Sequence, residues 1–146
     1  MATILSDVAT KQDNADVAVK TVPQEVHGRI RVANGVVSGT VVGTGAAGTV
    51  INLVKLPKGA RVLPSSKLYL EAGQNANVTI KVGDAADDDR YLAAVAMGAS
   101  KVTVALDKTA AIGATNLADE GWIFITTAVD ALTAKYIAFE IYYVID

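Results

Sequence analysis

Aliphatic residues alternate with polar ones in short runs along most of the chain after residue 28. Because successive side chains of a strand point to opposite faces, this alternation predicts strands that bury one face. Within the longest run, the side chains of Val62, Leu68 and Leu70 are expected to point inward. The clearest runs are Arg29–Val32, Val78–Val82 and Val102–Leu106, and two further runs, Val50–Leu56 and Ala60–Leu70, alternate less regularly.

Two later runs, Gly121–Val129 and Tyr136–Ile145, are apolar at nearly every position instead of every second one. One interpretation is a central strand that is covered on both faces within the chain. The other is a strand whose outer face lies in an oligomer interface, where Tyr and Trp are favoured. The pattern alone leaves both interpretations open.

Short segments between the runs predict turns and, at two places, brief helices. Pro57-Lys58-Gly59 predicts a tight turn that joins two strands into a hairpin, and Asn34-Gly35 and Gly73-Gln74-Asn75 have similar turn chemistry. The Ala-rich Tyr91–Met97 could form one or two helical turns. Asp130–Ala134 could begin a helix with Asp130 as its cap.

The order of these elements predicts an all-β fold of about eight strands. Irregular spacing and long connections favour an antiparallel β-sandwich, with a jelly roll as the first choice. Residues 28–146 form this single domain. Residues 1–27 are polar, lack periodicity and end near Pro23, which predicts an extended N-terminal arm that either crosses a neighbouring subunit or is a free tail.

Composition points to burial against other chains. Hydrophobic residues make up 51% of the chain and charged residues only 19%, below the roughly 25% of an average domain. Such a balance suggests apolar surface that another chain covers. The net charge of −2 argues against nucleic acid as a partner. The chain contains no run of about 18 apolar residues, the length that would predict a membrane span.

Charge is divided unevenly along the chain. Between Val26 and Leu70 there are six basic residues and no acidic one, whereas Asp84–Asp146 holds ten acidic and four basic residues. The folded chain either mixes these charges or presents two faces of opposite sign, which would suit contacts with a neighbour.

Reactive side chains are scarce. There is no Cys and one His, His27, which is best read as structural, so the sequence predicts no catalytic residue, no cofactor and no metal site. Asp84–Asp89 has the carboxylates of a calcium loop without the EF-hand register, and a solvated turn is the better interpretation. The glycine-rich Gly39–Gly48 lacks the Lys-Ser/Thr ending of a phosphate-binding loop.

Several strings resemble one family. Met1–Gln12, Val26–Ala33, Val54–Leu63, Val82–Asp84 and Asp89–Ala94 are similar, in order, to small head proteins of tailed bacteriophages that look like capsid decoration or cement proteins. The resemblance implies a β-sandwich or jelly roll that sits as a homotrimer on the outside of the capsid. It implies no catalytic residue.

Together these observations predict a structural virion protein that is not an enzyme. It would bind the major capsid protein at the capsid surface, after assembly in the host cytoplasm, without nucleic acid, membrane or cofactor. A fibre-type or carbohydrate-binding module is the alternative, and an enzyme using His27 or the Asp84–Asp89 loop is a third. The candidate oligomer and shell contacts are Arg29, Arg31, Arg61, Trp122, Tyr136 and Tyr142.

Overall fold

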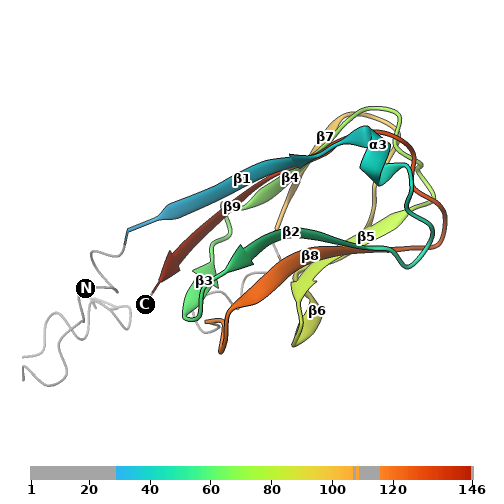
Figure 1. Ribbon diagram of the computed structural model, residues 1–146. Helices are drawn as coiled ribbons and strands as arrows, with labels where there is room; N and C mark the ends of the chain where they lie inside the picture. Colours follow the sequence, from blue (N-terminus) through green and yellow to red (C-terminus); the bar gives the residue numbers. More distant parts are fainter. Residues whose placement is uncertain (1–28, 107, 109–115, 146) are drawn as a thin grey trace, which may run out of the picture.

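The computed structural model describes residues 29–106, 108 and 116–145. They form two antiparallel sheets that face each other, so the predicted all-β sandwich is confirmed (Figure 1). Sheet A contains, in order, β1 (Arg31–Val37), β9 (Ile137–Ile145), β4 (Lys67–Leu70) and β7 (Val102–Ala105), with β3 (Ala60–Val62) also paired to β9. Sheet B contains β2 (Val50–Leu56), β8 (Gly121–Ala128), β5 (Thr79–Asp84) and β6 (Asp87–Ala96).

The core lies between the two inner faces. Val62, Leu68 and Leu70 are buried, as their alternation predicts, and they meet Ile123 and Ile125 of the opposite sheet in one continuous cluster. Full burial of one such side chain stabilises the folded state by about 1.5–3 kcal/mol. The alternating pattern therefore supplies the main driving force for the sandwich.

The described residues form nine strands, against about eight predicted. Asp87–Ala96 forms a strand that was not predicted, and the run Ala60–Leu70 is divided in two. β3 pairs with the end of β9 and β4 with its beginning. Between them the fully buried Ser66 hydroxyl donates to the Tyr142 carbonyl at 3.2 Å and accepts from the Tyr142 N–H at 2.8 Å. Pro64, which has no N–H, precedes it. The Leu63 N–H also donates to the Tyr142 carbonyl at 2.8 Å, so the Ser66 side chain adds to this backbone bond and supplies the acceptor for the Tyr142 N–H.

Two of the predicted turns differ from the structure. The turn at Pro57-Lys58-Gly59 exists, with Gly59 at φ 83° and the Ala60 N–H donating to the Pro57 carbonyl at 3.2 Å. It joins β2 of sheet B to β3 of sheet A, so the predicted hairpin is wrong. The turn predicted at Asn34-Gly35 is also wrong.

Gly35 lies inside β1 for a packing reason. It is paired with Phe139 of β9. A Cβ at Gly35 would come within 2.9 Å of the Phe139 ring, so this glycine makes room for an aromatic side chain.

Both predicted helical segments are wrong. Tyr91–Met97 lies mostly in β6, where Leu92 and Val95 pair with β5, so sheet pairing overrides the helix propensity of alanine. Asp130 does not cap a helix. Its carboxylate accepts from the Ala131 N–H at 2.7 Å and the Asn75 amide at 3.0 Å, which links two loops at the end of the sandwich.

The described residues contain one helix, the single turn α3 (Gly39–Val42). It begins the glycine-rich segment, which packs against the loop before β9. A Cβ at Gly43 would lie 2.6 Å from the Ala134 Cβ, and the Leu132 N–H donates to the Gly45 carbonyl at 2.9 Å. Close packing therefore accounts for these glycines. No helix in the described ranges is long and apolar enough to cross a membrane.

Candidate functional site

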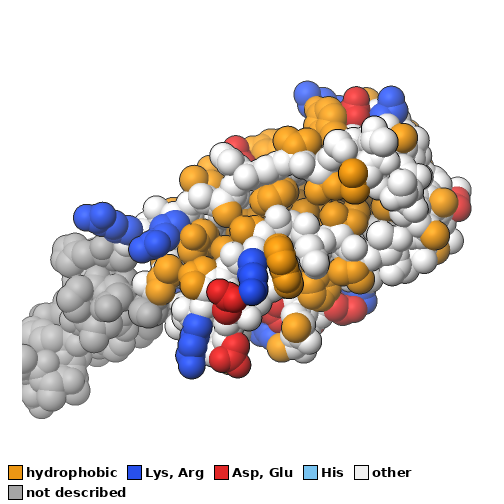
Figure 2. Space-filling view, in the orientation of Figure 1, with side chains coloured by type: hydrophobic (Ala, Val, Ile, Leu, Met, Phe, Trp, Pro, Cys, Tyr) orange, Lys and Arg blue, Asp and Glu red, His pale blue; other side chains and the backbone are white. Residues whose placement is uncertain are grey.

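One side of the sandwich is formed by a long stretch of chain without charge. Residues 32–54 contain no Asp, Glu, Lys, Arg or His, and they supply β1 after Arg31, all of α3, and β2 up to Lys55. β1 is an edge strand of sheet A, β2 is an edge strand of sheet B, and both lie on the same side of the molecule (Figure 1). We call residues 32–54 the uncharged edge. Figure 2 shows hydrophobic side chains gathered along this side, with Lys, Arg, Asp and Glu around its borders.

The uncharged edge has few of the devices that usually protect edge strands. Proteins normally guard edge strands with Lys, Pro or bulges, since unpaired N–H and C=O groups attract other strands. Here β2 has a bulge between Asn52 and Val54 and carries Lys55 near its end, and β1 carries Arg31 at its first residue. Between these charges, residues 32–54 contain neither a charge nor a proline. Large apolar side chains are exposed along both strands and α3: Val32 (52%), Val36 (66%), Val41 (60%) and Val50 (54%). A surface of this kind is typical of a contact with another chain.

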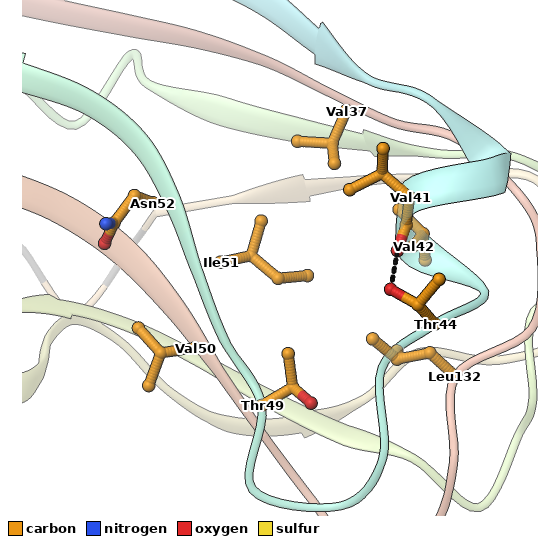
Figure 3. Close-up of a pocket in the computed structure, with 9 residues that line it drawn as sticks. All are labelled: Val37, Val41, Val42, Thr44, Thr49, Val50, Ile51, Asn52 and Leu132. Atoms are coloured by element: carbon orange, nitrogen blue, oxygen red, sulfur yellow. Dashed lines mark hydrogen bonds between the residues drawn. The ribbon is translucent and has the colours of Figure 1, made fainter.

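A cavity of about 350 Å³ opens within this edge, under α3 (Figure 3). Most of its wall is aliphatic, and the Thr44 hydroxyl is already used, donating to the Val41 carbonyl at 2.7 Å. The cavity therefore suits apolar side chains better than a charged ligand. Its lining residues are Val37, Val41, Val42, Thr44, Thr49, Val50, Ile51, Asn52 and Leu132.

The outer face of sheet A holds a tyrosine cluster. The hydroxyls of Tyr69 and Tyr142 both donate to one oxygen of Glu140, at 3.1 and 3.2 Å. The Glu140 charge raises the pKa of Tyr142 above its ordinary value of 10.0. The Lys67 ammonium lies 5.9 Å from the centre of the Tyr69 ring. These side chains are only half-buried, so the outer face of β9 remains open to a partner.

The outer face of sheet B presents Trp122, which is 45% exposed. It lies on β8 opposite Lys55 of β2, and Lys55 forms an ion pair with Glu120. The two runs that are apolar at nearly every position, Gly121–Val129 and Tyr136–Ile145, correspond to β8 and β9. Each is an interior strand of its sheet, with a buried inner face and a partly open outer face.

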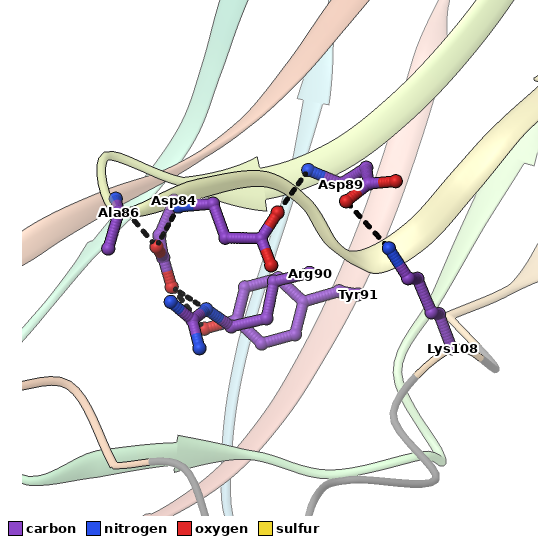
Figure 4. Close-up of polar contacts among 7 residues, drawn as sticks. Asp84, Ala86, Asp89, Arg90, Tyr91 and Lys108 are labelled. Atoms are coloured by element: carbon purple, nitrogen blue, oxygen red, sulfur yellow. Dashed lines mark hydrogen bonds and ion pairs between the residues drawn. The ribbon is translucent and has the colours of Figure 1, made fainter.

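The turn between β5 and β6 is polar and internally paired (Figure 4). Asp84, 5% exposed, forms an ion pair with Arg90 at 2.8 Å and accepts from the Tyr91 hydroxyl at 2.9 Å. Its other oxygen accepts from the N–H groups of Ala86 and Asp87, at 3.0 and 3.1 Å. Burial and the Asp84 carboxylate raise the pKa of Tyr91 above its ordinary value of 10.0. We call residues 84–91 the acidic turn.

The exposed carboxylates of the acidic turn have cationic neighbours. One carboxylate oxygen from each of Asp87, Asp88 and Asp89 lies within 4.8 Å of the others. Lys81 pairs with Asp88 at 2.5 Å and Lys108 with Asp89 at 2.6 Å. The hydrogen bond from Lys108 is the main cause that lowers the pKa of Asp89 from its ordinary value of 3.8. These contacts favour the interpretation as a structural turn.

The predicted contact residues fall into separate groups. Arg29 and Arg31 lie at the start of β1 and Arg61 on β3, at the same end of sheet A (Figure 1). Tyr136 precedes β9 at its other end, Tyr142 lies in the tyrosine cluster, and Trp122 lies on sheet B. His27 and the predicted arm, residues 1–27, lie outside the described residues.

The sequence reasoning missed the uncharged edge. The available signal was the absence of any charged residue from Val32 to Val54, although charges occur on both sides at Arg31 and Lys55. The sequence pattern identified β2 in this stretch and only the beginning of β1. It gave no indication that two edge strands from different sheets would lie on the same side.

Comparison with known proteins identifies the fold. No protein-family model and no curated protein matches the chain. Among solved structures, a chain of the capsid of Ralstonia phage GP4 is 19% identical with a TM-score of 0.60, covering 81% of this chain and 85% of that chain. A chain of the cyanophage Pam1 capsid asymmetric unit is 22% identical with a TM-score of 0.55, covering 82% and 86%.

A third similar structure is the acidic stable capsid of Helicobacter pylori bacteriophage KHP30. Its chain is 17% identical with a TM-score of 0.53, and the match covers 82% of this chain and 90% of that chain. At these identities the likeness concerns the fold. The sandwich described here is thus a fold that occurs in the capsids of three phages.

Proposed function

We propose that this protein is a structural component of a tailed-bacteriophage virion, and more specifically a cement or decoration protein on the outside of the capsid. The observation that carries the proposal is the likeness, over about four-fifths of the chain, to chains from three phage capsid structures. The described residues supply contact surfaces, and the polar groups of the acidic turn are engaged with one another.

We also propose that the sandwich is a jelly roll, a topology that recurs in viral capsid domains. With β3 set aside, eight strands remain, and a jelly roll pairs the first with the last, the second with the seventh, and so on inward. The observed pairs β1–β9, β2–β8, β4–β7 and β5–β6 follow this scheme. The strand order supports the proposal independently of any sequence likeness.

The proposed assembly is a homotrimer. A closed ring needs two different patches on each copy that fit each other. Arg29, Arg31 and Arg61 give one end of sheet A a positive patch, and the acidic turn gives sheet B a negative one. This separation of charge within one chain supports head-to-tail contact between copies.

The proposed shell contacts are the remaining predicted residues together with the arm. Trp122, Tyr136 and Tyr142 are aromatic and partly exposed, as expected for contact residues. The arm, residues 1–27, would extend across a neighbouring subunit, and the partner on the shell would be the major capsid protein. Assembly would take place in the host cytoplasm.

Sedimentation and particle binding test this function. The purified protein should sediment as a trimer at micromolar concentration and should pellet with purified phage shells that lack it. Deletion of residues 1–25 should leave a folded core and weaken pelleting. A protein that sediments as a monomer and stays in the supernatant with the shells would contradict the proposal.

A carbohydrate-binding module is the second candidate, because Trp122 is a half-exposed aromatic on an open sheet face. A glycan array discriminates between the two. Specific glycan binding that is lost in Trp122→Ala, together with no binding to shells, would favour this candidate.

A further inference from the structure

We propose that sheet B continues from one copy to the next within the trimer. The second half of β6, Ala93–Ala96, would add as an antiparallel strand to β2, Val50–Val54, of the neighbouring copy. This inference rests on the proposed trimer, and it specifies the two strands through which neighbouring copies would pair.

The second half of β6 is an exposed strand edge without charge. All four residues of Ala93–Ala96 are exposed, whereas Tyr91 and Leu92 just before them are buried. β6 is the last strand of sheet B, and among the described strands it pairs with β5 alone. Four residues of strand present about 13 Å of backbone, and their small side chains allow another strand to approach.

The edge that β6 would join lies at the other side of the same sheet. β2 is the first strand of sheet B, belongs to the uncharged edge and pairs only with β8 among the described strands. Neither edge segment, Val50–Val54 nor Ala93–Ala96, contains a charged residue. Their contact would bury no unpaired charge, and burial of such a charge strongly disfavours association.

The strand directions agree with a ring. Within sheet B every neighbouring pair is antiparallel, so β6 runs opposite to β2. A rotation about an axis along the strands keeps these directions, and β6 of one copy therefore meets β2 of the next in antiparallel orientation. Because β2 and β6 are different surfaces, the contact is heterologous and can repeat until the ring closes.

The side chains complete the fit. Val95 pairs with Ile80, so it lies on the inner face of sheet B, and it is 36% exposed. In the continued sheet it would lie on the same face as Ile51 of the neighbour, which lines the cavity of the uncharged edge. The added strand thus covers apolar side chains that a single copy leaves open.

Disulfide cross-linking tests the register directly, because the chain has no cysteine of its own. Cα atoms of opposite residues in antiparallel strands lie about 4.5–5.5 Å apart, within the range that a disulfide spans. The double variant Asn52→Cys with Ala94→Cys, or the shifted pair Val50→Cys with Ala94→Cys, should give covalent trimers on a non-reducing gel. Each single variant should give no species larger than a dimer.

A charge placed on the edge gives a second test. Ala94→Lys should weaken the trimer about tenfold or more in sedimentation, because a lysine on an edge strand opposes its pairing with another strand. Ala105→Lys is the matched control: Ala105 is also exposed, and it lies on β7, an edge strand of sheet A. Circular dichroism should show all variants folded.

The outcomes separate this inference from the proposed function. A trimeric protein in which neither cysteine pair links, and in which Ala94→Lys associates as tightly as Ala105→Lys, would overturn the strand junction and leave the trimer standing. A wild-type protein that is monomeric at micromolar concentration would overturn both.

Discussion

The acidic turn and the uncharged edge differ in whether their side chains find their partners within one copy of the chain. In the acidic turn, Asp84 is surrounded by Arg90, Tyr91 and two backbone N–H groups, so its polar groups are satisfied within the chain. In the uncharged edge, Val36, Val41 and Val50 point into solvent beside a cavity. The first region is complete in one copy, whereas the second gains from being covered.

This difference follows from the chemistry of the two regions. A carboxylate needs specific partners at hydrogen-bond distance, and nearby residues of the same hairpin can provide them. An apolar edge is stabilised by any contact that removes its surface from water. Another chain can make that contact as well as the same chain can. Substitutions in the acidic turn should therefore change folding stability, and substitutions on the uncharged edge should change association.

The largest expected effect is that of Asp84→Ala. The change leaves the Arg90 guanidinium and the Tyr91 hydroxyl without their carboxylate, and loss of one partner of a buried ion pair costs about 3 kcal/mol. Urea denaturation measures the free energy of unfolding. Asp88→Ala, at an exposed ion pair, should lose less than about 1 kcal/mol. Equal losses in the two variants would contradict the internally paired acidic turn.

Gly43→Ala should reduce stability by about 1–3 kcal/mol, because its methyl group would overlap the Ala134 Cβ and backbone. Thermal unfolding followed by circular dichroism checks this. Ala47→Ser, an exposed position on the same segment, is the control. A variant with unchanged thermal stability would show that α3 and the loop before β9 are not packed as closely as described.

Tyr91→Phe should cost about 1–2 kcal/mol at neutral pH through loss of the hydrogen bond to Asp84. It should also change the alkaline response. Since the pKa of Tyr91 is raised on folding, its stabilising contribution is fully present below its unfolded pKa of about 10 and is lost as pH rises above that value.

The comparison is made by denaturation between pH 8 and pH 11. The free energy of unfolding should fall more steeply above pH 10 in the wild type than in Tyr91→Phe, so the two curves converge. Parallel curves over this range would exclude Tyr91 as the source of the alkaline loss.

The smallest expected effect on folding is that of Val36→Lys on the uncharged edge. Val36 is 66% exposed, so the free energy of unfolding should change by no more than about 0.5 kcal/mol. Association should weaken instead, because lysine protects an edge strand. Light scattering during concentration checks the second part. A large loss of stability with unchanged association would reverse the proposed distinction between the two regions.

Much of the fold was predictable from particular residues. Val62, Leu68 and Leu70 were expected inside and are buried, since alternation fixes which face of a strand is apolar. The helix expected at Tyr91–Met97 failed because pairing with β5 outweighs the propensity of three alanines. The hairpin expected at Pro57–Gly59 failed because a turn fixes local direction and not the sheet that receives the next strand.

The candidate contacts were predictable in kind and only partly in place. Residue type alone selected Trp122 and Tyr142 as aromatic contacts, and both are partly exposed. The structure places these two residues on different sheets. Tyr142 shares the carboxylate of Glu140 with Tyr69, which lies 71 positions before Glu140 in the chain. Spacing along a chain carries no information about such neighbours.

The sequence by itself determined most of the strands, their buried faces and the shortage of reactive groups, because these follow from side-chain chemistry and a period of two. Only the tertiary structure decided which strands became edges, and that β1 and β2 would expose an uncharged side together. Those features arise from pairing between distant segments, where the free energy depends on all partners at once.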